Sequence, residues 1–284
     1  MFNIVEKKII FIVISLVIIA AGIVSYFTFG GFNTDIDFAG GTEIVISGLK
    51  YDEGNITKIF KDIDKEIKIS TIQKTEDGVM VKTKYLSDKQ ATLVKDTIPD
   101  TNKGAKVLSV DSISPTIGKE LWKSAATSIA IAALLMLLYI TFRFEVLSGI
   151  AAVIALLHDL LIMIAFYVIF RVPVNTSFIA AILTILGYSI NATIVIFDRI
   201  RENNRMMKKV AFGEVVNKSI WQTLGRSINT SLTTLFTLVV LYIIGVQSIK
   251  EFALPLIVGI VAGTYSSVFI SGPVWAMLKG EKKA

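Results

Sequence analysis

The sequence contains no cysteine, one histidine and few charged residues, which make up 18% of its 284 residues. Without cysteine, the chain has no disulfide, no thiolate zinc site and no cysteine nucleophile, and one histidine excludes a site with several histidine ligands. We therefore expect no metal and no cofactor. The glycine and lysine motif that binds nucleotide phosphates is also missing, so nucleotide hydrolysis is not expected. An ordinary soluble domain has about a quarter of its residues charged, which argues against a soluble protein.

The hydrophobic residues, 53% of the total, are concentrated in six apolar runs that cover nearly half of the chain. The runs are residues 9–29, 125–142, 146–170, 178–197, 228–246 and 252–278. Each reaches or nearly reaches the roughly 20 residues that a helix needs to cross about 30 Å of hydrocarbon. The sequence therefore predicts a polytopic α-helical membrane protein with six transmembrane helices.

The basic residues give the chain a formal net charge of +6. Because their positions depend on the order of the apolar runs, they do not indicate a nucleic-acid partner. In the short connections they gather on one alternating side, which includes both ends of the chain, while the other side holds only Arg171 and Lys250. By the positive-inside rule, both termini are predicted to be cytoplasmic. The first run is too long for the core of a signal peptide and is interpreted as an anchor.

Three segments are expected from this pattern. Residues 1–29 form the cytoplasmic N-terminus and the first transmembrane helix, and residues 30–124 form one extracytoplasmic domain. Residues 125–284 contain the other five transmembrane helices. Within them, the connection 198–227 mixes apolar and basic residues, and it is predicted to be an amphipathic helix lying flat on the membrane.

Four strands and two helices are predicted in the extracytoplasmic segment from the spacing of its apolar residues. The strands are residues 42–47, 70–75, 79–84 and 106–113, and the helices are residues 56–66 and a second helix capped by Ser87 and ended by Pro99. Glu76, Asp77 and Gly78 are expected to form a tight turn, because the Asp-Gly pair tolerates positive φ. The order βαββαβ is a split βαβ arrangement, a fold that does not by itself specify a function.

His158 and Asp159 are the only Lys, Arg, Asp, Glu or His residues within the six apolar runs. A charged aspartate at the bilayer centre costs roughly 2.5–3.5 kcal/mol, so such residues face the bundle interior and are candidates for a function such as ion coupling. The alternative is that both residues only form hydrogen bonds that fix helix packing.

Further polar residues follow the last three apolar runs at helical spacing. One line holds Thr184, Gly187, Tyr188, Asn191 and Asp198, and a second holds Arg226, Thr230, Thr233, Thr234 and Thr237. Facing each other, the two lines would form the polar seam that ion or proton coupling needs, although threonines also join helices without further function. Gly259, Gly263 and Ser266 form a small-residue face that predicts close helix packing.

Several motifs resemble the SecF family, whose members are the smaller partner of SecD in bacterial protein export. The first is Asp37, Phe38, Ala39, Gly40, Gly41 and Thr42; others are residues 115–121, the Leu-His-Asp sequence ending at Asp159, and residues 187–193 and 197–203. The resemblance implies half of a resistance-nodulation-division transporter, located in the bacterial cytoplasmic membrane, with a ferredoxin-like outer domain. It also implies SecD, the SecYEG channel with SecA, and a translocating polypeptide as partners, an ion gradient as energy source, and no enzymatic activity.

One position departs from the family pattern. An acid usually follows the asparagine of the fourth transmembrane helix, and here that position is Ala192. Asp159 or an acid on SecD would then take the protons, or sodium would replace them; an acid on SecD is favoured. Arg226 matches the family arginine that is thought to support ion passage.

Two alternatives remain, and a third, a hydrolase, is set aside. The chain could be an assembly partner of SecD without ion coupling of its own, or a small-molecule or lipid exporter of the same superfamily. A hydrolase would need a serine within hydrogen-bond reach of His158, for which Ser189 is the candidate. The sequence around Ser189 breaks the nucleophile-elbow motif, so the enzyme interpretation is set aside.

Overall fold

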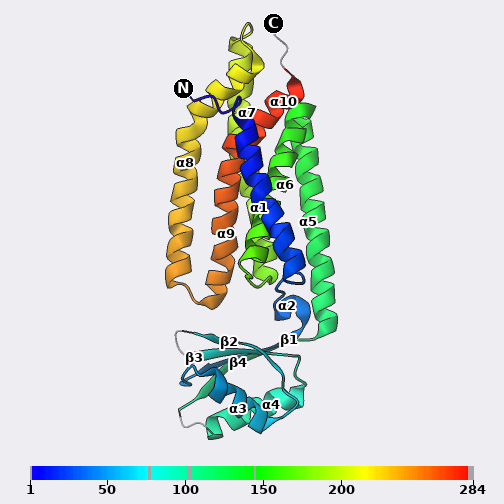
Figure 1. The fold of residues 1–284 in the computed structure, drawn as a ribbon, viewed down its shortest axis with the longest axis vertical. Helices are drawn as coiled ribbons and strands as arrows, with labels where there is room; N and C mark the ends of the chain where they lie inside the picture. The colour runs from blue at the N-terminus through cyan, green and yellow to red at the C-terminus, as the bar shows by residue number, and fades with distance from the viewer. Residues whose placement is uncertain (1, 76–77, 102–103, 144, 281–284) are drawn as a thin grey trace. The chain divides into compact units, whose positions relative to one another are not determined.

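The computed structural model describes residues 2–75, 78–101, 104–143 and 145–280 (Figure 1). The chain divides into two compact units. We call them the helical unit, made of Met1–Asn33, Thr127–Pro173 and Ser177–Ala284, and the sheet unit, made of Thr34–Ala126 with Val174–Thr176.

Six helices of the described chain are long and apolar enough to cross a membrane, which confirms the predicted number. They are α1 (Lys8–Thr28), α5 (Pro115–Arg143), α6 (Val146–Ile169), α7 (Thr176–Met206), α8 (Phe212–Ile244) and the last span, Gln247–Lys279. The last span combines α9 (Gln247–Ser266), a π-helical segment η1 (Ser267–Ser271) and α10 (Gly272–Lys279). Segments of π-helix are rare and often occur at functional sites. The position of η1 relative to the buried polar residues is therefore informative.

The predicted amphipathic helix over residues 198–227 is wrong. Residues up to Met206 continue α7, and α8 begins at Phe212, so two helix ends form a hairpin (Figure 1). Of the apolar residues that suggested membrane contact, Ile200, Val215 and Ile220 are fully buried, and Met207, Val210 and Leu224 are half-buried. Asn203 Nδ2 donates to Ser219 Oγ across the hairpin at 2.8 Å. For the three buried residues, the apolar spacing therefore reflects packing within the protein.

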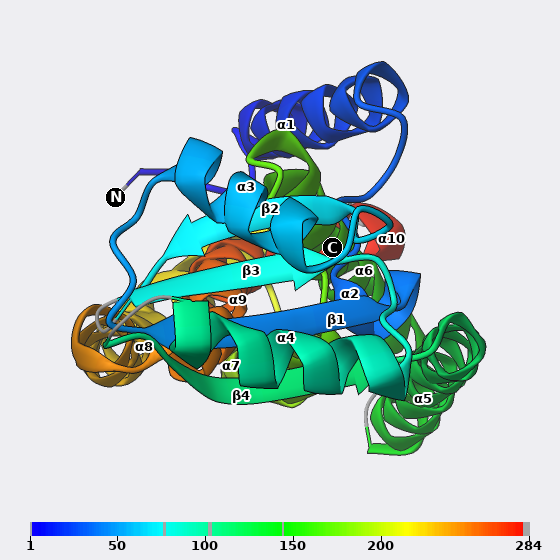
Figure 2. The ribbon, with the colours of Figure 1, turned by 90° about the horizontal axis from the view of Figure 1, so that it is seen from below.

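The sheet unit contains a four-stranded antiparallel sheet in the order β2-β3-β1-β4. Its elements are the short helix α2 (Ile36–Ala39), β1 (Gly41–Ser47), α3 (Glu53–Ile63), β2 (Ile69–Lys74), β3 (Gly78–Thr83), α4 (Asp88–Thr101) and β4 (Lys106–Ile113). From β1 onward the element order is βαββαβ. Figure 2 shows α3 and α4 crossing the same face of the sheet, where Ile44, Phe60 and Val94 form part of the core.

Two predictions in this unit concern the end of the second helix and the turn of residues 76–78. The helix predicted to break at Pro99 continues to Thr101, because a proline in the last turn removes only one hydrogen bond before the helix ends. Of the predicted turn, Glu76 and Asp77 lie outside the described residues, and Gly78 begins β3 with a φ of 159°.

The end of α3 is joined to the start of α4 by Asp64. Gln90 Nε2 donates to Asp64 Oδ2 at 2.8 Å, and the Glu66 backbone N–H donates to the other oxygen at 2.8 Å. These two hydrogen bonds to the charged form lower the pKa of Asp64 below its ordinary value. Ser87 and Gln90 form the capping box that begins α4, so one glutamine serves both contacts.

Candidate functional site

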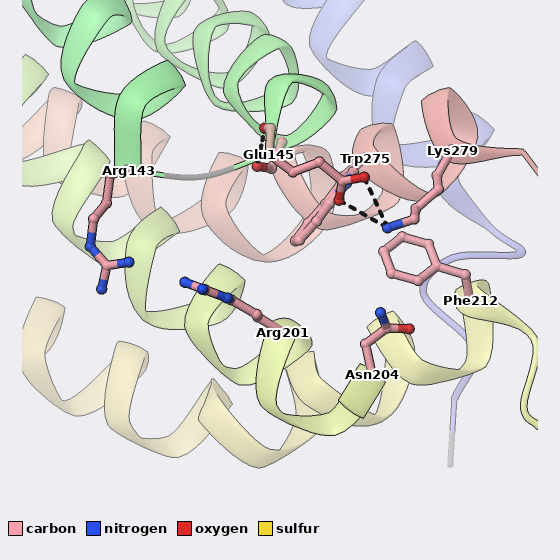
Figure 3. Close-up of a pocket in the computed structure, with 8 residues that line it drawn as sticks. Arg143, Glu145, Arg201, Asn204, Phe212, Trp275 and Lys279 are labelled. Carbon is pink, nitrogen blue, oxygen red and sulfur yellow. Dashed lines mark hydrogen bonds and ion pairs between the residues drawn. The ribbon is translucent and has the colours of Figure 1, made fainter. Parts of the chain in front are cut away.

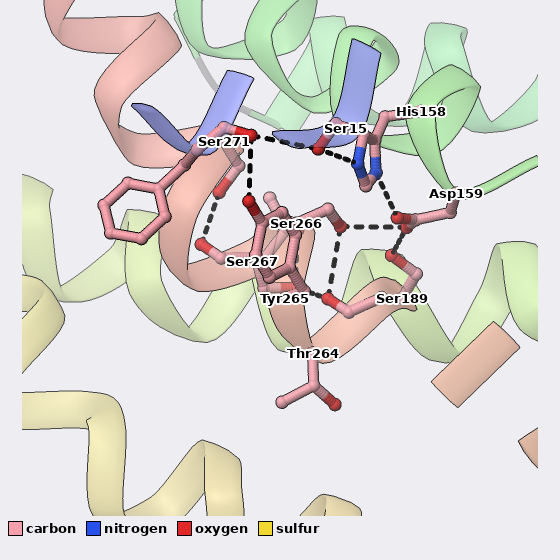
Figure 4. A network of polar contacts seen from close by, with 12 residues as sticks. Ser15, His158, Asp159, Ser189, Thr264, Tyr265, Ser266, Ser267 and Ser271 are labelled. Carbon is pink, nitrogen blue, oxygen red and sulfur yellow. Dashed lines mark hydrogen bonds and ion pairs between the residues drawn. The ribbon is translucent and has the colours of Figure 1, made fainter. Parts of the chain in front are cut away.

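Asp159 is the centre of a buried polar network in the helical unit (Figure 4). Its side chain is 1% exposed, and His158 beside it is 8% exposed. His158 Nδ1 lies 2.9 Å from Asp159 Oδ1, and His158 Nε2 lies 2.8 Å from the Ser15 hydroxyl on α1. A single histidine therefore connects the carboxylate on α6 to α1.

Two serine hydroxyls bind the other carboxylate oxygen. Ser189 on α7 and Ser266 at the end of α9 both donate to Asp159 Oδ2, the latter at 3.0 Å. The one carboxylate thus contacts three further helices, directly or through His158. No described lysine or arginine forms an ion pair with Asp159, whose side-chain contacts are His158 and the two serine hydroxyls.

The π segment η1 begins directly after Ser266. Ser267 Oγ donates to the Gly263 carbonyl at 2.7 Å and lies 3.2 Å from Thr193 Oγ1 on α7. The wider turn of this segment thus lies next to the carboxylate. The sequence gives no sign of the π segment, because such a segment has no simple residue pattern.

The serine expected near His158 is a different one. Ser189 contacts Asp159, and the hydroxyl that meets His158 belongs to Ser15. Ser15 was missed as a site residue, although it stood out as an isolated serine among apolar residues of the first run. It lines, with His158, an otherwise apolar groove of about 480 Å³ between α1, α6 and α9.

The small-residue face of α9 packs closely against α7. A Cβ atom added at Gly259 would lie 2.5 Å from Ile185 Cγ1, and one added at Gly263 would lie 3.0 Å from Ser189 Cβ. Since Ser189 holds Asp159, this close approach positions one of the donors of the network. Gly259, Gly263 and Ser266 therefore lie on the side of α9 that borders the network.

Replacing Gly263 by valine is expected to lower the stability of the protein by about 1–3 kcal/mol, because the new methyl groups overlap Ser189. The apparent melting temperature of the purified full chain measures this effect. Gly187→Val is the matched control, since a Cβ at Gly187 meets no atom within 4 Å. Equal melting temperatures for the two variants would contradict the prediction.

The second polar region lies on the other side of α7, where it faces α8. Tyr188 donates to the Thr230 carbonyl at 3.2 Å, and a cavity of about 70 Å³ is lined by Asn191, Ala192 and Arg226 among others. Arg226, Asn191 and Thr230 are exposed on this chain. The structure thus brings these three predicted residues together, and it places them apart from the Asp159 network.

Six residues of the two polar lines do not line this cavity, and Thr233 and Asp198 are among them. Thr233 is exposed and its hydroxyl donates to the Thr230 carbonyl of its own helix at 2.9 Å. Asp198 is exposed near the end of α7. The two helical lines therefore meet over only part of their length.

The motif of residues 37–42 forms the joint between α2, β1 and the start of α5. Gly40 has a φ of +74°, and a Cβ there would lie 2.8 Å from Pro115 Cα. At Gly41, a Cβ would lie 2.7 Å from the Thr83 carbonyl oxygen. The two glycines are needed because neither position has room for a side chain.

The other motif residues are held by specific contacts. Phe38 packs edge-to-face against Trp122 with ring centroids 5.0 Å apart. Thr42 Oγ1 lies 2.8 Å from Ser112 Oγ and accepts from the Leu86 N–H. Asp37 accepts a hydrogen bond from the Thr176 N–H at 2.8 Å. All these contacts lie within the sheet unit, so the motif has a clear structural role there.

A buried ion pair next to this motif was missed by sequence analysis. Lys82 Nζ on β3 lies 2.7 Å from both carboxylate oxygens of Asp35 and 3.2 Å from Glu43 on β1. The Asp35 side chain is 6% exposed and also accepts from the Ile36 N–H at the start of α2. In the sequence, nothing distinguishes the three residues from solvent-exposed charged residues of the extracytoplasmic segment.

Comparison with known families gives a match over most of the chain. Residues 93–281 match the family model described as the C-terminal part of protein export membrane protein SecD/SecF. The protein translocase subunit SecF of Sebaldella termitidis is 37% identical over 283 residues, which cover 96% of this chain and 91% of that protein. The subunit SecF of Acidaminococcus fermentans is 35% identical and covers 99% of each chain.

Fused relatives are similar as well. The protein translocase subunit SecDF of Bacillus subtilis is 38% identical over 98% of this chain and 38% of its own length. The crystal structure of SecDF from Thermus thermophilus, titled a translocon-associated membrane protein, superposes with a TM-score of 0.85 at 32% identity. It covers 98% of this chain and 38% of that chain.

Proposed function

Because this chain belongs to the SecF family of protein translocase subunits, we propose that it pairs with SecD and uses a proton or sodium gradient to assist export through the SecYEG channel. The sheet unit would be a ferredoxin-like domain on the outer side of the cytoplasmic membrane, and both termini would be cytoplasmic. Its movement would help a polypeptide leave the channel after SecA has pushed it. The membrane location and the translocase role follow from the six spans and the relatives.

The observation that most supports a partner is the exposed polar face of α7 and α8. Arg226 lies on α8 two residues before the apolar run 228–246, and it is exposed together with Asn191 and Thr230. A charged side chain that faces lipid is costly unless another polar group or water meets it. A second protein that covers this face removes that cost.

SecD is the partner that the relatives indicate. The fused relatives are named SecDF, and this chain corresponds to 38% of the length of the Bacillus subtilis protein. A separate chain that supplies the remaining part would place its own membrane helices against this one. We infer that the face containing Arg226 is where these helices dock.

Arg226→Ala is expected to weaken binding to SecD about tenfold or more, since a central arginine of an interface commonly contributes 2 kcal/mol or more. The amount of SecD that co-purifies with the tagged full chain measures the effect. Lys218→Ala is the matched control, because Lys218 is exposed on the same helix and does not line the cavity. Equal recovery of SecD with both variants would argue against this docking face.

Ion coupling is the less direct part of the proposal, because Ala192 occupies the position of the expected acid. The acid would then come from SecD, or Asp159 would serve in its place. The cavity beside Ala192 is lined by Arg226 and Ser227, and the buried Ser227 hydroxyl has no hydrogen-bond partner among the described residues. A carboxylate at position 192 would therefore find both a cation and a donor nearby.

Ala192→Asp is expected to increase ion-dependent export about fivefold, which corresponds to a coupling free energy of about 1 kcal/mol. The rate of export of a secreted reporter, with and without a dissipated ion gradient, measures this gain. Ala192→Asn is the control of equal size without charge. If neither variant changes export, the second candidate function is favoured, in which this chain only assembles and positions SecD.

A further inference from the structure

A basic cavity lies at the end of the helical unit where α5 ends and where α6 and α8 begin. Its volume is about 340 Å³, and Figure 3 shows the side chains around it. Three basic residues and one acidic residue are among those that line it: Arg143, Arg201, Lys279 and Glu145. The balance of charge in the cavity is therefore positive and suits an anion.

Within the cavity, the acid is already neutralised by one of the bases. Lys279 Nζ lies 2.9 Å from Glu145 Oε2 and 4.6 Å from the centroid of the Phe212 ring. The side chains of Arg201 and Asn204, on α7, make no hydrogen bond or ion pair with any residue that the structure describes. A guanidinium group has five N–H donors in a fork that fits the oxygens of a phosphate. These donors are available to a ligand.

Two helix N-termini add to the positive potential of the cavity. Glu145 precedes the first residue of α6, and Phe212 is the first residue of α8. At neither terminus does the N-cap side chain accept a hydrogen bond from the first turn. Unsatisfied N–H groups and the helix dipole at these ends favour a negative charge nearby.

The residues next to the cavity indicate where the anion comes from. Phe142 is 97% exposed and Val146 is 60% exposed, and both neighbour cavity residues in the sequence. Met277 and Leu278 on α10 are also exposed, and Trp275 lines the cavity beside them. Aromatic rings next to basic groups at the ends of membrane helices are typical of the headgroup region, with apolar side chains against the acyl chains.

We propose that this cavity binds the phosphate group of an anionic membrane phospholipid, with Arg201 and Asn204 as the donors that contact it. Arg143 adds positive charge, and Figure 3 shows its guanidinium group on the same side of the view as that of Arg201. The exposed apolar residues beside the cavity then contact the acyl chains of the same lipid. This proposal does not depend on export activity or on SecD.

The test uses the full chain in detergent micelles, with bound lipid counted by native mass spectrometry. The probes are phosphatidylglycerol, zwitterionic phosphatidylcholine and inorganic phosphate. Wild type is expected to retain phosphatidylglycerol in preference to phosphatidylcholine, and Arg201→Ala to weaken its binding about tenfold, as expected for the loss of hydrogen bonds to a charged group. Arg201→Lys, which keeps the charge but loses the fork, is expected to give an intermediate affinity.

Arg205→Ala is the matched control, because Arg205 is exposed on the same helix and does not line the cavity. It is expected to change lipid binding less than about twofold. If inorganic phosphate displaces phosphatidylglycerol, the cavity accepts phosphate from either source; if it does not, the acyl chains are part of recognition. Equal binding of the two lipids, or equal binding by wild type and Arg201→Ala, would overturn the proposal.

Discussion

Asp159→Asn is expected to lower the rate of protein export about tenfold while the chain still folds and still binds SecD. Asparagine keeps the size of the side chain and one oxygen acceptor, so the contacts with His158 and the two serines change little in geometry. It removes the only carboxylate among the described residues within the apolar core of the membrane helices. A coupling interaction of 1–3 kcal/mol corresponds to about 5–150-fold in a rate or affinity.

Export of a secreted reporter in cells depleted of the protein and complemented with each variant measures this effect. Ser189→Ala is the control, since it removes one hydrogen bond to Asp159 and leaves the charge. Asp159→Leu is expected to destabilise the fold instead, because the Ser189 hydroxyl and His158 Nδ1 would be left buried without a hydrogen-bond partner. Export at the wild-type rate with Asp159→Asn would limit the network to a packing role.

Lys82→Met is expected to destabilise the sheet unit by about 3–5 kcal/mol, because it leaves the buried Asp35 carboxylate without its cation. Hydrogen exchange of the backbone amides of β1 and β3 in the full chain measures the loss, since opening of these strands becomes more frequent. The expected result is faster exchange confined to the sheet unit.

Two comparisons separate the ion pair from the loss of a lysine. Lys84→Met removes an exposed lysine just beyond β3 and is expected to have little effect. The double variant Asp35→Asn, Lys82→Met is expected to recover part of the lost stability, because asparagine removes the unpaired charge and still caps α2. A Lys82→Met protein with unchanged exchange would show that the ion pair with Asp35 does not stabilise the sheet unit.

The membrane class, the number of spans and the family all follow from the order of residues along the chain. Apolar runs of about 20 residues have few other structures open to them, because unpaired backbone groups are too costly in lipid. The βαββαβ order of the sheet unit also follows from the sequence, since the spacing of apolar residues along a short segment distinguishes a helix from a strand. The rarity of charge in the runs identified Asp159 and His158 as candidate residues.

Which side chains meet depends on how the helices pack in three dimensions. Ser15, Ser189 and Ser266 come from three different helices, and their contact with His158 and Asp159 depends on how the helices pack. For the same reason, the apolar residues of the connection 198–227 suggested a membrane surface, whereas a helical hairpin buries three of them. Amphipathic spacing shows that one face of a helix is buried away from water, but it does not show whether protein or lipid covers that face.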